Sequence, residues 1–113
     1  VSYCGGDNIA IINAHPDRIG YLHLKQVDEQ VRAKVAADDL PFGEAVRLGA
    51  MTEPPRGIPE MPPLLEAVAA LDIDIFGIVE QDMYPCSPDA PLPIAQRTQK
   101  YLGSCGVPAV RFS

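Results

Sequence analysis

The spacing of apolar residues changes along the chain, and prolines mark the places where it changes. No proline occurs within 17–40, 64–84 or 94–107, whereas prolines crowd 54–63 and 85–93. Proline interrupts helices and central strands, because it lacks a backbone N–H and fixes φ. We therefore expect most of the regular structure in the three proline-free windows and loops in the two proline-rich ones.

Two segments have the pattern of β-strands. Within 19–25, leucines alternate with Tyr21, His23 and Lys25, so these three side chains are predicted to share one face of a strand. Residues 73–80 contain a nearly continuous apolar run. Such a run is typical of a strand that is buried on both faces.

Five helices are predicted around these strands. The basis is apolar spacing of three or four residues, as at Val27, Val31 and Val35, together with Asp or Pro at the first turn. We expect them from Asp7 to before Pro16, over 28–37, over 43–48, from Pro62 or Pro63 onward, and over 92–101 with Gly103 following. Residues 51–63 and 82–93 are predicted to be loops.

The order of these elements determines the predicted fold class. Strands that alternate with helices indicate βαβ units and a parallel sheet, so the class is α/β. Two parallel strands with apolar faces leave two edges open and do not form a stable sheet by themselves. The strand count therefore predicts that these residues are one piece of a larger sheet.

Composition narrows the function classes. The chain has 113 residues, 47% of them hydrophobic, and a formal net charge of −6, as in one globular domain. The basic residues are scattered, and no apolar run approaches the roughly 18 residues of a membrane span, so we expect neither nucleic-acid nor membrane binding. The N-terminus has no signal-peptide pattern. The three cysteines lack C-x-x-C spacing and are predicted to be free thiols in a cytoplasmic protein.

Candidate chemistry lies at the ends of the two predicted strands. His23 is near the end of the first strand and Glu80 ends the second, and ligands of parallel α/β folds bind at the carboxyl ends of strands. Histidine and glutamate are ordinary ligands of Mn²⁺, Co²⁺ and Zn²⁺. Two alternatives remain open at this point, namely a hydrogen-bonded interior histidine and a salt bridge from Glu80 to Lys25.

Three further residues are candidates because of their position near these strand ends. Lys25 shares a face with His23 and could polarise a substrate oxygen or contact a phosphate, or be an exposed lysine without a role. Asp82 follows Glu80 on the same predicted face. Tyr84 could form a pocket wall or cover a core. His15, before Pro16, is interpreted as a residue at a helix end and not as a ligand.

Two motifs carry a resemblance to a known family: His23-Leu24-Lys25 after 19–22, and Ile78-Val79-Glu80-Gln81-Asp82-Met83-Tyr84. They resemble the xylose-isomerase-like TIM-barrel superfamily, and within it the branch of sugar phosphate isomerases/epimerases and inosose dehydratases. The stretch 41–49 and the ending 95–102 also look like that branch. The resemblance covers nearly the whole chain.

The resemblance implies a fold and a metal site. That family holds a divalent metal with Glu, Asp, His and Glu side chains at the ends of late strands. His23 matches the histidine of the seventh strand and Glu80 the glutamate of the eighth, so both are implied metal ligands. The other two ligands belong to earlier strands, and Gln26 stands where relatives often carry Asp.

A TIM barrel needs about 250 residues. Residues 1–113 are therefore expected to be a single segment, the C-terminal part of a (β/α)8 TIM barrel, with about two parallel strands, flanking helices and a helical insertion. That insertion spans 28–61 and follows the first strand on the side of the active-site loops. We expect it to form a lid or an oligomer contact.

The resemblance also implies an activity: metal-assisted proton abstraction next to a carbonyl, leading to isomerisation, epimerisation or dehydration. Glu80 is then a metal ligand and catalytic acid/base, and Lys25 is catalytic or contacts substrate, as Asp82 and Tyr84 would. The expected cofactor is Mn²⁺ or Co²⁺, with Zn²⁺ or Mg²⁺ as alternatives. The expected substrate is a sugar, sugar phosphate or inosose, and a homo-oligomer is expected.

Two other hypotheses belong to different classes. The first is a catalytically incomplete fragment or assembly module, with two of four ligands and open strand edges. The second is a relative of the apurinic endonucleases, which the acidic net charge disfavours.

Overall fold

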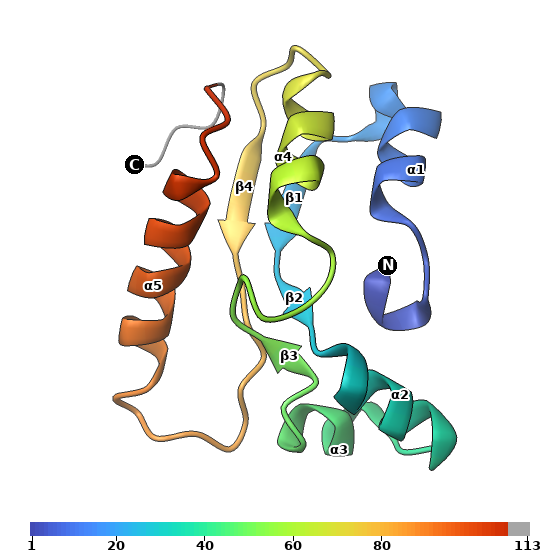
Figure 1. Cartoon of the computed structure of the whole chain (residues 1–113), viewed down its shortest axis with the longest axis vertical. Helices are drawn as coiled ribbons and strands as arrows, with labels where there is room; N and C mark the ends of the chain where they lie inside the picture. The colour runs from blue at the N-terminus through green and yellow to red at the C-terminus, as the bar shows by residue number, and fades with distance from the viewer. Residues whose placement is uncertain (109–113) are drawn as a thin grey trace.

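Two parallel strands form the centre of the molecule (Figure 1). In the computed structural model, which describes residues 1–108, β1 (Tyr21–Leu24) pairs with β4 (Phe76–Val79). Tyr21 lies opposite Phe76 and Leu24 opposite Val79. The chain between them supplies the crossover that a parallel pair requires. The predicted α/β class with two parallel strands is therefore confirmed.

The helices begin and end close to their predicted limits. Asp7 caps the first one by accepting a hydrogen bond from the Ala10 N–H at 3.0 Å, and Asp28 caps the second through the Gln30 and Val31 N–H groups. Proline stands in the first turn of α4 and of α5, as expected. The bounds are α1 (Asn8–Ala14), α2 (Glu29–Ala37), α3 (Phe42–Arg47), α4 (Met61–Ala69) and α5 (Pro91–Ser104).

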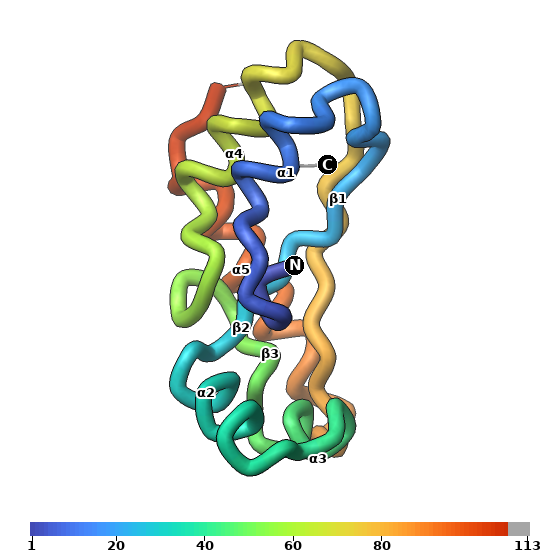
Figure 2. The backbone as a smooth tube through the Cα atoms, turned by 90° about the vertical axis from the view of Figure 1, so that its right-hand side faces the viewer, coloured from blue at the N-terminus to red at the C-terminus, as the bar shows by residue number. Residues whose placement is uncertain are grey.

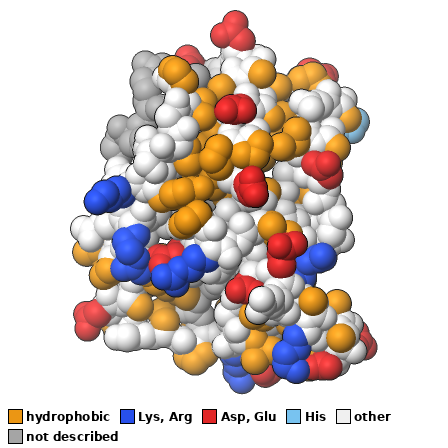
Figure 3. Space-filling model, in the orientation of Figure 1, with side chains coloured by type: hydrophobic (Ala, Val, Ile, Leu, Met, Phe, Trp, Pro, Cys, Tyr) orange, Lys and Arg blue, Asp and Glu red, His pale blue; other side chains and the backbone are white. Residues whose placement is uncertain are grey.

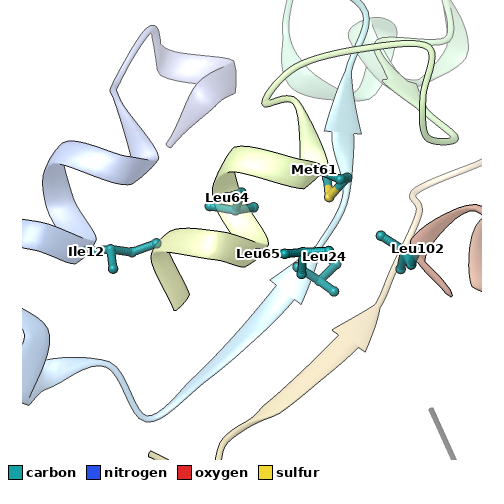
Figure 4. Close-up of a cluster of buried hydrophobic side chains, with 6 residues drawn as sticks. All are labelled: Ile12, Leu24, Met61, Leu64, Leu65 and Leu102. Carbon is teal, nitrogen blue, oxygen red and sulfur yellow. The ribbon is translucent and has the colours of Figure 1, made fainter. Parts of the chain in front are cut away.

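One apolar cluster fixes α1, α4 and α5 to the sheet (Figure 4). The cluster has six buried side chains. Helix α4 contributes three of them, and α1, β1 and α5 contribute one each. The six are Ile12, Leu24, Met61, Leu64, Leu65 and Leu102. Figure 2 shows α1, α4 and α5 together on one side of the strands.

The opposite face of the sheet is bare in the described chain. On this face Phe76 is 83% exposed, Tyr21 63% exposed and Ile78 47% exposed. The expectation that 73–80 is buried on both faces is therefore wrong for this chain. The reason is that helices cover one face only, and β4 has β1 as its one strand neighbour among residues 1–108.

Two very short strands were not expected within the loop. β2 (Gln26–Val27) pairs antiparallel with β3 (Met51–Thr52), so 51–63 is not loop throughout. Two-residue strands are too short to show any periodicity. A second correction concerns Gly103, which lies inside α5; the left-handed backbone after that helix is at Gly106, with φ 71°.

A cavity of about 620 Å³ lies between α4, α5 and the strands. Figure 3 shows apolar side chains gathered over this region. Leu22, Leu65, Val68 and Leu102 are among its lining residues. The cavity is on the helix side of the sheet, whereas Tyr21 and His23 alternate with Leu22 and face the other way. We therefore interpret it as a packing gap.

None of the helices within residues 1–108 combines the length and the apolar character needed to cross a membrane.

Gly57 offers a test of the contact between its loop and β2. A Cβ atom placed there would lie 2.4 Å from the Val27 carbonyl oxygen, and backbone cannot easily shift. We expect Gly57→Ala to lower the free energy of unfolding by about 1–3 kcal/mol. Gly43 in α3 has open space around its Cβ position, so Gly43→Ala should be neutral or stabilise by about 0.5–1 kcal/mol. Urea unfolding of the two variants measures the difference, and equal midpoints would contradict the packing described.

Candidate functional site

The candidate site lies where β1 and β4 end. The Glu80 N–H donates to the Leu24 carbonyl at 3.2 Å and so extends the parallel pairing one residue beyond the strands. Because side chains alternate along a strand, His23 and Glu80 both project from the bare face. The Tyr21 ring packs beside His23, with ring centroids 5.7 Å apart. The predicted shared face of Tyr21, His23 and Lys25 is consistent with these contacts.

His23 and Glu80 converge on each other. His23 Nδ1 contacts Glu80 Oε2 at the separation of an ion pair but without the geometry of a hydrogen bond. Oε2 is buried and has no hydrogen-bond donor among residues 1–108. A buried carboxylate oxygen without a donor is costly. The arrangement therefore has the features of two ligand atoms that face a common point.

Lys25 links two carboxylates on this face. Its Nζ donates to Glu80 Oε1 at 2.8 Å and to Asp82 Oδ2 at 3.0 Å. Burial works to lower the pKa of Lys25, but the hydrogen bonds and charges of Glu80 and Asp82 outweigh it, so this pKa is raised. The hydrogen bond from Lys25 lowers the pKa of Glu80 against the effect of burial, with help from the Lys25 charge. At neutral pH Lys25 is therefore a cation and Glu80 a carboxylate.

The structure brings four of the five predicted site residues together and separates the fifth. His23, Lys25, Glu80 and Asp82 form one connected cluster. Tyr84 is 76% exposed, and within the described residues it makes no hydrogen bond or ring contact with that cluster. The alternative of a salt bridge between Glu80 and Lys25 also exists, alongside the contact of Glu80 with His23.

The cluster fits part of a metal site. An imidazole nitrogen and a carboxylate oxygen are the donor types that Mn²⁺, Co²⁺ and Zn²⁺ accept, and Glu80 Oε2, which contacts His23 Nδ1, accepts no hydrogen bond from residues 1–108. In residues 1–108, no group of three or more His, Cys, Asp or Glu side chains is placed to hold a metal ion. His23 and Glu80 could therefore supply two ligands to a metal ion, and further ligands would be needed to complete a site.

One charged contact near the site was missed in the sequence. Glu53 is 7% exposed, and both its oxygens accept hydrogen bonds from Arg97 of α5, at 3.0–3.4 Å. Arg56 lies 3.3 Å from the same carboxylate. The residues that meet here are 44 positions apart, and no periodicity links them, so only the tertiary fold reveals the pair.

A small cavity that Glu80 helps to line lies near this contact. The cavity has a volume of about 180 Å³ and lies between the strand ends and the start of α5. Pro54, which follows Glu53, is one wall, and Met83 and Ile94 form others. The Glu53–Arg97 pair therefore holds the loop after β3 against α5 next to the candidate site.

Removing Arg97 tests how much this pair contributes. Arg97→Met leaves a mostly buried carboxylate with Arg56 as its remaining partner, so we expect a loss of about 1–3 kcal/mol in the free energy of unfolding. The matched control is Arg47→Met, which removes an exposed pair with Glu44 and should change stability by less than about 0.5 kcal/mol. Urea denaturation followed by circular dichroism compares the two. If both variants unfold at the same urea concentration, Glu53 is not held by Arg97.

A mixed α/β arrangement of two parallel strands with helices on one face corresponds to part of a TIM barrel. No protein-family model matches the chain, and no solved structure gives a significant match.

Curated proteins do match over most of the chain. The inosose dehydratase of Geobacillus thermodenitrificans is 30% identical over 106 residues, which are 93% of this chain and 35% of the relative. The inosose dehydratase of Lacticaseibacillus casei is 33% identical over 98 residues, or 87% of this chain and 33% of the relative. The inosose dehydratase of Glaesserella parasuis is 30% identical over 99 residues, which are 88% of this chain and 33% of the relative.

The chain is homologous to the C-terminal third of the inosose dehydratases, a xylose-isomerase-like TIM-barrel family. It spans about a third of the length of the curated relatives that it matches. The resemblance found in the motifs of the two strand ends is thereby confirmed.

Proposed function

We propose that this chain is the C-terminal part of a metal-dependent lyase that dehydrates an inosose. The observation that carries the proposal is the contact between His23 Nδ1 and Glu80 Oε2, an oxygen without a hydrogen-bond donor among residues 1–108, at two neighbouring strand ends. The relatives named inosose dehydratase favour dehydration over the isomerase and epimerase activities that the motifs alone leave open.

His23 and Glu80 would hold the divalent metal, for which Mn²⁺ or Co²⁺ is our first choice and Zn²⁺ or Mg²⁺ the alternative. When bound, such an ion polarises a substrate carbonyl and so acidifies the neighbouring C–H bond. The described residues supply only two candidate ligands. We therefore propose that the remaining ligands come from other strands of a complete barrel, and that the chain alone is catalytically incomplete.

The charges in the cluster suggest a division of labour. The raised pKa of Lys25 keeps it protonated, so it donates a hydrogen bond to a substrate oxygen and does not serve as a base. The lowered pKa of Glu80 keeps it ionised, as a ligand or proton acceptor requires. In the dehydration, the C–H bond next to the carbonyl gives its proton to a carboxylate. Its electron pair forms the new double bond, and the β-hydroxyl leaves with a proton as water.

The segment 28–61 has a proposed role in the same site. It follows β1 at its carboxyl end and contains α2, α3 and β3. Its own small core is formed by Val35, Ala45 and Ala50. We propose that this segment is an insertion that covers the site as a lid or contacts another subunit of a homo-oligomer. Substrate contacts by Asp82 and Tyr84 remain proposals of the same kind.

A chimaera tests the proposed activity. The C-terminal third of the Geobacillus thermodenitrificans relative is replaced by this chain, and the folded product is assayed for inosose dehydration with Mn²⁺ or Co²⁺. We expect turnover by the chimaera and none by the 113-residue chain alone. Glu80→Gln should reduce kcat/KM by about 10²–10⁴-fold, because it removes a carboxylate at the reacting centre.

The control for that variant is Glu44→Gln. Glu44 is an exposed residue of α3 that pairs with Arg47, and its substitution should leave kcat/KM unchanged. Full activity of Glu80→Gln, or activity that survives removal of metal by a chelator, would show that the roles proposed here are wrong.

A further inference from the structure

The two strand ends share an arrangement that the proposed chemistry does not use. Lys25 is followed by Gln26, and Glu80 is followed by Gln81. Because successive side chains point to opposite sides of extended chain, each glutamine is directed away from the charged cluster. Both glutamine amides donate to backbone carbonyls of one segment, residues 51–59.

Both the nitrogen and the oxygen of the Gln26 side-chain amide form hydrogen bonds. Gln26 is 1% exposed. Its Nε2 donates to the Pro59 carbonyl at 2.6 Å, and its Oε1 accepts from the Gly57 N–H at 3.0 Å. No apolar residue of the same size could satisfy those two backbone groups. The amide therefore fixes the backbone directly after Lys25.

Gln81 makes the corresponding contact on the other strand. Its Nε2 donates to the Met51 carbonyl at 3.3 Å. Gln81 lies between Glu80 and Asp82 in the chain, and both of those carboxylates accept hydrogen bonds from Lys25. A rotation of the backbone at Gln81 would change the position of one acceptor relative to the other.

The segment 51–59 is itself held firmly enough to act as a support. Met51 and Thr52 pair with β2, and Val27 exchanges two backbone hydrogen bonds with Ile58, at 2.8 and 2.9 Å. Glu53 binds Arg97 of α5. Figure 1 shows β3 beside β2, just beyond the arrowheads of β1 and β4. The residues that follow β1 and β4 are therefore both hydrogen-bonded to segment 51–59.

We propose that Gln26 and Gln81 are positioning residues through which segment 51–59 aligns the ends of β1 and β4, so that Lys25 meets Glu80 and Asp82. Neither glutamine touches the reacting atoms. Each acts through the charged residue beside it. The assignment rests on the proposed function only for its catalytic meaning, because the alignment itself is a property of this chain.

The first test observes the alignment without metal or substrate. In the ¹⁵N-labelled full chain, the Lys25 ammonium group is expected to give a slowly exchanging signal because two carboxylates hold it. We expect Gln81→Met and Gln26→Met each to abolish that signal, as Glu80→Gln does. Lys34 pairs with one exposed carboxylate, that of Asp38, so its ammonium group should exchange rapidly with water and give no slowly exchanging signal in any of these proteins.

The controls are two exposed glutamines, Gln30 on α2 and Gln96 on α5. Gln30→Met and Gln96→Met should leave the Lys25 signal intact. Gln81 is only partly buried, so Gln81→Met is expected to keep the amide spectrum of the core around Leu102. Loss of the Lys25 signal together with an unchanged core spectrum would show that the substitution alters the site and leaves the fold intact.

The second test uses Mn²⁺ alone as the probe. We expect Gln26→Met and Gln81→Met to weaken the apparent Mn²⁺ affinity of the full chain about 10-fold, as loss of a group that orients a ligand does. Absence of Mn²⁺ binding by the unchanged chain would count against the proposed function and would leave the ammonium test to decide the alignment.

Two results would overturn the positioning role. One is a Lys25 ammonium signal that survives in folded Gln81→Met and Gln26→Met. The other is unfolding of both variants, because the glutamines would then serve the stability of the fold and not the alignment of the site.

Discussion

The parallel pairing of β1 and β4 is the constraint on which the rest of the molecule depends. It brings together Lys25 and Glu80, which are 55 positions apart in the chain, so that Lys25 Nζ lies 2.8 Å from Glu80 Oε1. The pairing also sorts side chains by face, because Leu24 enters the helix-covered core while His23 projects from the bare face. A slip of one residue would exchange these faces, burying the polar set and exposing the leucines. Core and candidate site therefore depend on the same register.

Three polar contacts beyond the β1–β4 pair are the ones that we propose hold that register at the strand ends. Gln26, Gln81 and Glu53 all bind or belong to segment 51–59, which sits between the two strands and α5. Their combined effect is to fix backbone on both sides of the charged cluster while leaving the cluster itself open. A site of this kind is supported by rigid neighbours. Residues 1–108 contain no group of three or more side chains placed to hold a metal ion, and the chain is homologous to about a third of the length of the relatives that it matches.

Much of this could be predicted from the sequence, and the failures have physical causes. The caps at Asp7 and Asp28 and the two strands were predictable because local propensity and periodicity encode them. The motifs at the strand ends indicated the family, which the comparisons support. The bare face of β4 was not predictable, since an apolar run reports a need for burial and not which chain provides it. The support by 51–59 depends on contacts between distant residues such as Glu53 and Arg97, which leave no local pattern.

The central claim is that His23 and Glu80 are two ligands of one metal site. The chain contains only two histidines, and His15 at the end of α1 is a built-in reference for His23. The most direct measurement is the broadening of both imidazole NMR signals by substoichiometric Mn²⁺. Binding at the strand ends predicts that the His23 signals broaden selectively, and that Glu80→Gln removes the selectivity. Equal broadening of the two histidines, or none at His23, would contradict the account.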